Sequence, residues 1–142
     1  MISQKAITIS SKIFIGFSIV SVGYVSILSL LDPKSTMEMV NTSLNNNDAI
    51  SSIRGIYGGV GIVITSCLIY LLFKDLKKGL SFLSLFWGAY AISRIITIVI
   101  DGPLGDFGNQ WLMIESVLFV FALSLVMLYK KSFQVPKNIS TL

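Results

Sequence analysis

The sequence contains no histidine, a single cysteine and few charged residues, and each shortage excludes a class of site. With Cys67 alone, the chain cannot form an internal disulfide or a Cys-x-x-Cys redox pair. Without histidine, it lacks a common ligand of haem and zinc. We therefore expect no metal and no cofactor. Because Cys67 lies in an apolar run, we expect it to be a small packing residue.

Charge is scarce in this chain, whereas apolar residues are abundant. Charged residues make up 13% of the sequence, against about 25% in soluble domains, and hydrophobic residues make up 54%. The mean hydropathy is +0.80. These values predict an integral membrane protein, and the length of 142 residues leaves room for one domain, residues 1–142. The net charge of +4 does not indicate a nucleic acid, because the lysines border apolar runs and would face lipid headgroups.

Four apolar runs predict four membrane-spanning helices, at about residues 13–31, 49–73, 80–100 and 111–129. The first run carries no charge and would span roughly 28 Å as a helix, about one hydrocarbon core. A basic start before an apolar run is also typical of a signal peptide. We expect a retained helix instead, because the run is long and ends without the small residues of a cleavage site.

Polar residues between the runs predict where helices begin and end. Asp32 followed by Pro33 fits the start of a short helix on the membrane surface. The asparagine run at residues 45–47, followed by Asp48, is suited to capping the second span. Gly102 and the proline after it predict the end of the third span.

The lysines predict the orientation of the bundle. They concentrate in the N-terminal segment, in the turn at residues 74–79 and in the C-terminal segment. By the positive-inside rule, these three segments are cytoplasmic. We therefore expect an all-α, antiparallel up-down four-helix bundle in the inner (cytoplasmic) membrane, as a multi-pass protein with both termini cytoplasmic.

Glycines at the start of the second span predict close helix packing. Gly55 and Gly59 form a G-x-x-x-G pair, and Gly58 lies beside them. In an apolar segment this pattern is typical of a helix contact, so we expect Gly55, Gly58 and Gly59 to be packing residues. The context is not that of a phosphate-binding loop.

Several charged and aromatic residues lie at similar depth in the predicted bundle. Helical rise places them in the outer half of the spans. The candidate site consists of Arg54, Tyr57, Tyr90, Arg94, Asp101 and Glu115. Two cations and two carboxylates are formally neutral together, as a buried cluster should be. The short connection after the third span makes Arg94 and Glu115 neighbours, and we expect them to be directly coupled.

The sequence leaves two functions open for this cluster. In the first, Arg54 and Arg94 hold an anionic small molecule or a lipid headgroup, and the carboxylates balance the charge. In the second, the cluster is a clamp that fixes helix register in a structural or accessory membrane subunit. An enzyme is a third reading, but no pairing of a nucleophile with a base is visible, so we expect no catalytic residues.

The segment Arg-Gly-Ile-Tyr-Gly-Gly at residues 54–59, Arg94 with residues 101–103, and Glu115 resemble a known family. It comprises the small four-helix bacterial membrane proteins of domain-of-unknown-function family 4345, which look akin to the DoxX-like group. The resemblance covers roughly residue 33 to the end of the fourth span. It implies a four-helix membrane fold and no established activity. Some DoxX-like proteins are linked to quinone or thiol redox systems, so a quinone joins the potential ligands. A partner membrane protein or a homo-oligomer also stays open.

Overall fold

The computed structural model describes residues 3–133, which form helices and turns and contain no strand within that range. In chain order the elements are α1 (Gln4–Leu31), α2 (Pro33–Glu38), α3 (Asn47–Ile53), η1 (Arg54–Gly59), α4 (Val60–Lys74), α5 (Leu76–Ile100) and α6 (Asp106–Phe133). The segment η1 is a turn of π-helix that joins α3 to α4, so the three form one long helix.

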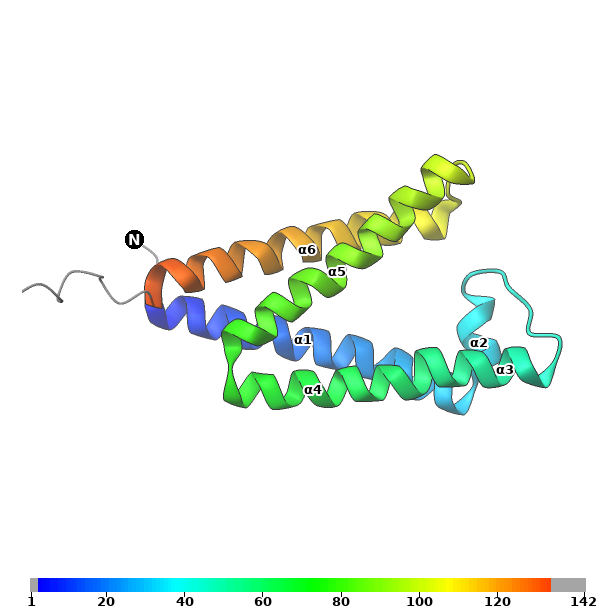
Figure 1. Cartoon of the computed structure of the whole chain (residues 1–142), viewed down its shortest axis with the longest axis horizontal. Helices are drawn as coiled ribbons and strands as arrows, with labels where there is room; N and C mark the ends of the chain where they lie inside the picture. Colours follow the sequence, from blue (N-terminus) through cyan, green and yellow to red (C-terminus); the bar gives the residue numbers. More distant parts are fainter. Residues whose placement is uncertain (1–2, 134–142) are drawn as a thin grey trace, which may run out of the picture.

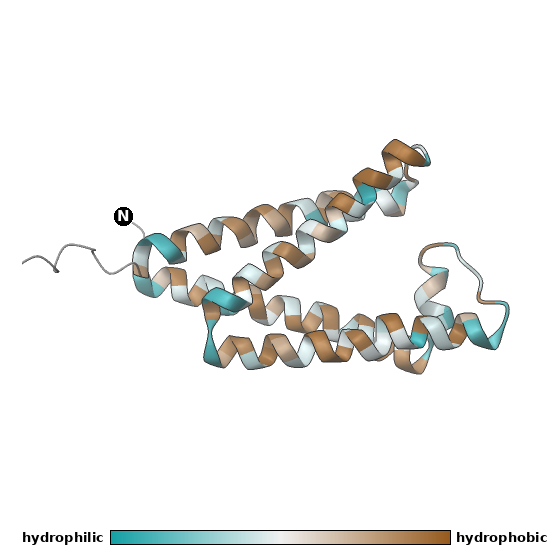
Figure 2. Cartoon of the chain, viewed as in Figure 1, coloured by the Kyte–Doolittle hydropathy of each residue, from teal (hydrophilic) through white to brown (hydrophobic). Residues whose placement is uncertain are grey.

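Four helices are long and apolar enough to cross a membrane. They are Gln4–Leu31, Asn47–Lys74, Leu76–Ile100 and Asp106–Phe133. Each predicted span falls inside one of these helices, which confirms four long apolar helices. Figure 2 shows apolar residues along the shafts and polar residues at the ends and in the turns. Apolar residues around most of a helix suit a lipid environment.

The caps begin and end the helices where the polar residues predict. Asp32 accepts a hydrogen bond from the Ser35 backbone at 3.2 Å, and Pro33 opens α2. The side chain of Asn46 accepts from the backbone of Ala49 at 2.8 Å and caps α3. After α5, Gly102 has φ +106°, in the left-handed region that glycine tolerates.

Successive long helices run in opposite directions and form two hairpins (Figure 1). In the N-terminal hairpin, α1 packs along η1 and α4, whereas in the C-terminal hairpin, α5 packs along α6. One end of the molecule contains the start of α1, the α4–α5 turn and the end of α6. We call it the lysine-rich end, and its lysines are Lys5, Lys12, Lys74, Lys77, Lys78, Lys130 and Lys131.

The hydrophobic core lies in the half of the bundle nearer the lysine-rich end. It consists of Phe14, Ile15, Leu68, Leu80, Leu83, Trp87, Ala122, Leu125 and Val126. These residues come from the early parts of α1 and α5 and the late parts of α4 and α6. All four long helices therefore meet there, and Trp87 is buried among them.

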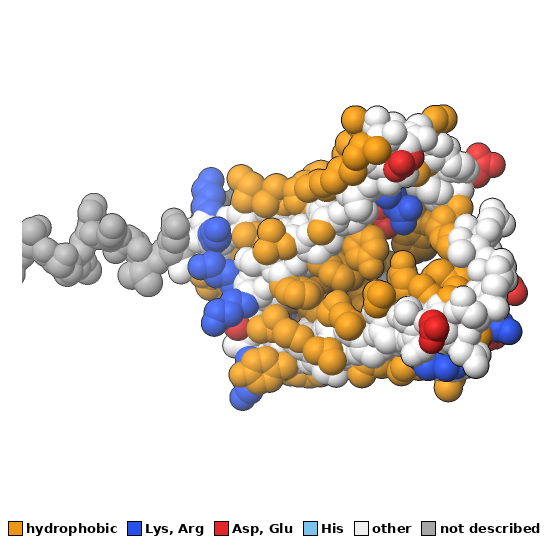
Figure 3. Space-filling model, turned by 45° about the vertical axis from the view of Figure 1, so that its right-hand side comes forward, with side chains coloured by type: hydrophobic (Ala, Val, Ile, Leu, Met, Phe, Trp, Pro, Cys, Tyr) orange, Lys and Arg blue, Asp and Glu red, His pale blue; other side chains and the backbone are white. Residues whose placement is uncertain are grey.

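The two hairpins part toward the opposite end, which we call the open end (Figure 1). Buried residues near that end lie within a hairpin, such as Ser26 and Gly61 between α1 and α4. In the space-filling view of Figure 3, the surface is hollowed between the hairpins, and apolar side chains line much of the hollow. The hydrophobic core therefore joins the two hairpins only in the half of the bundle nearer the lysine-rich end.

Candidate functional site

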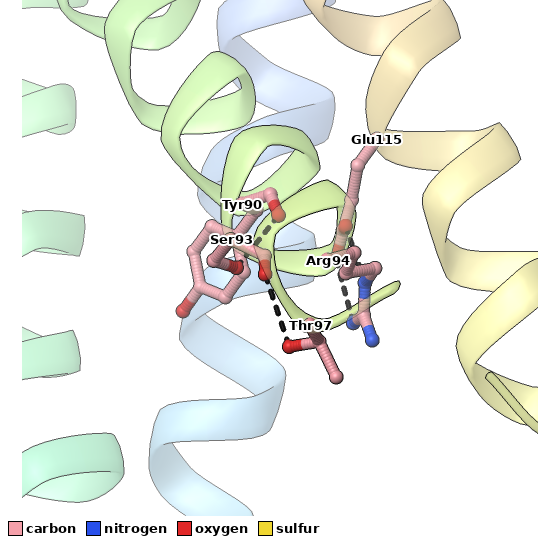
Figure 4. Close-up of polar contacts among 5 residues, drawn as sticks. All are labelled: Tyr90, Ser93, Arg94, Thr97 and Glu115. Atoms are coloured by element: carbon pink, nitrogen blue, oxygen red, sulfur yellow. Dashed lines mark hydrogen bonds and ion pairs between the residues drawn. The ribbon is translucent and has the colours of Figure 1, made fainter. Parts of the chain in front are cut away.

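Arg94 on α5 and Glu115 on α6 form a two-point ion pair. The Arg94 Nε donates to Glu115 Oε2 at 2.6 Å, and Nη2 donates to Oε1 at 2.9 Å (Figure 4). This side-on geometry matches the planar guanidinium to both carboxylate oxygens, and it is the strong form of such a contact. The predicted coupling between these residues is therefore present as a direct contact.

The two partners differ in exposure. The Glu115 side chain is 3% exposed, whereas that of Arg94 is 22% exposed. A buried carboxylate needs a fixed partner, and Arg94 supplies both hydrogen bonds. Within residues 3–133, Nη1 of Arg94 has no hydrogen-bond partner, so the cation keeps unused N–H donors.

Two tyrosines face the same region from different hairpins. Tyr57 belongs to η1 and Tyr90 to α5, and Tyr57 lies near both Tyr90 and Arg94. In Figure 4, Tyr90 and Arg94 leave α5 in different directions, with Arg94 turned toward Glu115. Tyr57 and Tyr90 are 38% and 39% exposed as residues, and in the part of the chain described their hydroxyls have no hydrogen-bond partner.

The position of Arg54 corrects the predicted six-residue cluster. Its Nε donates to the backbone carbonyl of Leu30 at 2.9 Å, rather than to a carboxylate. Leu30 lies in the last turn of α1, where carbonyls lack helical partners and the helix dipole is negative. Arg54 therefore caps α1 from η1. The sequence pattern could not show this, because the contact depends on how α1 and η1 pack.

Asp101 does not join the cluster either. It caps the end of α5, where its backbone N–H donates to Thr97, and the residue is exposed. Within residues 3–133, no Lys or Arg nitrogen lies within 4 Å of its carboxylate. Seven residues of helix separate it from Arg94, and Arg94 turns sideways to α6 rather than along α5. The structure thus brings Tyr57, Tyr90, Arg94 and Glu115 together, and leaves Arg54 and Asp101 outside.

The glycines of η1 have different surroundings. A Cβ at Gly58 would stand 2.7 Å from the Leu30 side chain and 3.1 Å from its backbone nitrogen, so this glycine allows α1 and η1 to approach. A Cβ at Gly55 or Gly59 would meet nothing within 4 Å. Within residues 3–133 the G-x-x-x-G pair therefore faces no helix, and the packing expected of Gly55 and Gly59 stays a prediction that would need a helix from outside the chain.

Other close helix contacts were not predicted. A Cβ at Gly61 would collide with the Ser26 hydroxyl, and a Cβ at Gly88 would stand 3.0 Å from the Phe119 ring. Gly88 follows Ser84 by four residues on the buried face of α5. This small-x-x-x-small spacing is a signal that could have identified the α5–α6 contact from the sequence.

The arrangement supplies hydrogen-bond donors rather than a free cation. Two phenols and the remaining Arg94 N–H groups are available, while Glu115 balances the guanidinium charge. Such a site suits acceptor oxygens on an otherwise apolar molecule. A cavity of about 470 Å³ beside α2 and one of about 330 Å³ at the lysine-rich end are lined by other residues.

Comparison with known families gives one finding. A family model matches residues 10–126, and the description of that family is Domain of unknown function (DUF4345). The match includes η1, Arg94 and Glu115. No curated protein and no solved structure gives a significant match to the chain.

Proposed function

Because this chain belongs to the DUF4345 family, whose description assigns no activity, we propose a function from its site: binding of a membrane lipid between the two hairpins. The lipid tail lies in the apolar hollow, and its polar head meets Tyr57, Tyr90 and Arg94. Two observations carry the proposal: the hairpins part and leave a hollow, and Arg94, which lies near Tyr57 of the other hairpin, has an unused Nη1 within residues 3–133.

The charge of the site favours head-group oxygens over a free anion. Arg94 is already paired with Glu115, so a second full negative charge would find no unbalanced cation at this site. Ester carbonyl and phosphodiester oxygens can accept from the phenols and from Nη1 without displacing Glu115. The sequence suggested that Arg54 and Arg94 would hold an anion together. Arg54 instead caps α1, so only Arg94 remains at the site.

The proposal includes membrane insertion as one four-span domain in the inner membrane, with the lysine-rich end and both termini cytoplasmic. The lysine distribution supports this orientation. In a Cys67→Ser background, we would introduce cysteine at Ser43, Gly105 or Lys78 and treat intact spheroplasts with an impermeant thiol reagent. Ser43→Cys and Gly105→Cys should react from outside. Reaction at Lys78→Cys instead would reverse the orientation.

A structural clamp is the second candidate, favoured by the two-point contact of Arg94 with buried Glu115. In that role, the pair fixes α5 against α6, and the hollow holds only bulk lipid. The two candidates differ at the phenols, because Tyr57 and Tyr90 make no hydrogen bond to the pair within residues 3–133. A lipid-binding site needs their hydroxyls, whereas a clamp does not.

Native mass spectrometry of the detergent-extracted chain tests the proposal. We expect the wild type to retain a lipid in the hollow. Tyr57→Phe with Tyr90→Phe should weaken retention about tenfold, because two donors are lost at about 0.5–1.5 kcal/mol each. The control is Tyr24→Phe with Tyr70→Phe, whose side chains are 66% and 62% exposed. Equal retention by both variants would contradict lipid binding by the two phenols and would favour the structural clamp.

Two further expectations stay predictions: that the chain is related to the DoxX-like group, and that its ligand is a quinone. Superposition on an experimental DoxX-like structure would test the first, and the retained mass would test the second. A homo-oligomer or partner protein is likewise a prediction. Gly55 and Gly59 have open space that a helix from outside the chain could occupy.

A further inference from the structure

The lysine-rich end contains a second candidate site, separate from the hollow. A cavity of about 330 Å³ is lined by Lys77, Tyr129, Lys130 and Phe133. Lys77 comes from the first turn of α5, and the other three come from the last turns of α6. The cavity therefore brings two cations from different helices to one place.

The aromatic residues give the cavity an apolar wall. The rings of Tyr129 and Phe133 stack with centroids 4.5 Å apart and planes 23° from parallel. Tyr129 also packs against the hydrophobic core, which anchors the wall to the bundle. On the neighbouring turn, Gln4 donates to the Ser132 carbonyl at 2.7 Å and ties the start of α1 to the end of α6.

The charge around the cavity is unbalanced. Within residues 3–133, the carboxylate at this end is that of Asp75, which pairs with Lys78 at 3.3 Å. Neither Lys77 nor Lys130 pairs with a carboxylate in that range. Lys77 lies at the positive end of the α5 dipole, where a cation is unfavourable unless an anion is near. Figure 3 shows blue side chains gathered at this end.

We propose that this cavity binds a phosphate group, held by the ammonium groups of Lys77 and Lys130 across the α5–α6 hairpin. Lysine ammonium groups bind phosphate as point charges, and the aromatic wall covers the apolar part of a head group. Two sources share this chemistry: an anionic lipid at the membrane surface and a soluble phosphate. The site does not depend on the lipid proposed for the hollow.

The test compares three probes on the detergent-solubilised full chain: dioctanoyl phosphatidylglycerol, dioctanoyl phosphatidylcholine and inorganic phosphate. Native mass spectrometry gives the Kd of each. The test variant is Lys77→Gln with Lys130→Gln. The control variant is Lys74→Gln with Lys131→Gln, which removes the same charge from the same end but does not alter the cavity lining. Circular dichroism checks that both variants keep the wild-type helix content.

For a lipid source, we expect phosphatidylglycerol to bind the wild type and the control with similar Kd. The test variant should bind about 30-fold more weakly, given about 1 kcal/mol for each lysine near an anionic headgroup. Phosphatidylcholine should bind more weakly than phosphatidylglycerol, because its choline cancels the charge. If inorganic phosphate shows the same loss in the test variant alone, the source is soluble phosphate. Equal weakening in both variants, or in neither, would overturn the site.

Discussion

Arg94 on α5 and Glu115 on α6 join the two helices of the C-terminal hairpin through a two-point ion pair. They are 21 residues apart in the sequence, and two hydrogen bonds of 2.6 Å and 2.9 Å connect them. The pair neutralises a buried carboxylate and leaves Nη1 of the guanidinium without a hydrogen-bond partner within residues 3–133. One contact thus both holds the C-terminal hairpin together and fixes the donor that faces the proposed ligand.

The first prediction concerns the coupling of this pair. Arg94→Met and Glu115→Gln should each lower the free energy of unfolding by about 3–5 kcal/mol, because the first leaves the buried Glu115 and the second leaves the partly buried Arg94 without its ionic partner. The double variant should lose less than the sum of the single losses, by about 0.5–3 kcal/mol. Unfolding in mixed detergent measures all four proteins, and strict additivity would contradict direct coupling.

The second prediction separates neighbouring glycines. Gly58→Ala should destabilise the protein by about 1–3 kcal/mol, because its Cβ would stand 2.7 Å from Leu30. Gly59→Ala, with open space around its Cβ, should be neutral or stabilising by up to about 1 kcal/mol. Thermal unfolding in detergent measures both. Equal destabilisation would mean that Gly59 also contacts a helix, most directly that of a second copy.

The third prediction concerns the cap of α1. Arg54→Met should lower the stability by about 1–2 kcal/mol, since the Leu30 carbonyl loses a charged donor. Lipid retention should not change, because Arg54 lies outside the site formed by Tyr57, Tyr90 and Arg94. Paired measurements of melting temperature and retained lipid check this. A loss of lipid at unchanged stability would return Arg54 to the binding site.

The fourth prediction is a pH dependence at the start of α5. The backbone N–H of Lys78 donates to Asp75 at 3.0 Å and lowers the pKa of this carboxyl below its ordinary 3.8. Because the folded pKa is the lower one, the stabilisation is present above about pH 5 and fades as the pH falls through the folded value.

Asp75→Ala should therefore melt below the wild type at neutral pH, and the difference should shrink in acid. Asp75→Asn can keep the helix cap but carries no titrating charge. Its own melting temperature should therefore not show the fall in acid that comes from protonation of Asp75. Melting curves between about pH 3 and 7 measure both variants. A difference that stays constant over this range would mean that the carboxylate charge does not stabilise the helix.

The sequence was sufficient for the helices, because their signals are local. Apolar runs between polar caps predict the four long helices, and Asp32, Asn46 and Gly102 mark boundaries found in the structure. Depth along the third and fourth runs also predicted the contact of Arg94 with Glu115. A short loop joins these helices, so residues at one depth meet.

The rest of the site could not be predicted, because it depends on how the hairpins pack. Equal depth also suggested that Arg54 would join the cluster, but depth does not say which way a side chain turns around its helix. Arg54, the first residue of η1, turns toward α1 and donates to the Leu30 carbonyl. The parting of the hairpins likewise follows from a core confined to one half, a property of the whole bundle.

The most direct test asks whether Arg94 binds a lipid or only clamps two helices. Arg94→Met with Glu115→Gln removes both charges and leaves no buried ion, and its fold is checked by circular dichroism and gel filtration. Native mass spectrometry then measures the retained lipid against wild type. We predict that the folded double variant binds the lipid at least about tenfold more weakly, since the charged donor is lost. Retention at the wild-type level would contradict the binding site and establish the clamp.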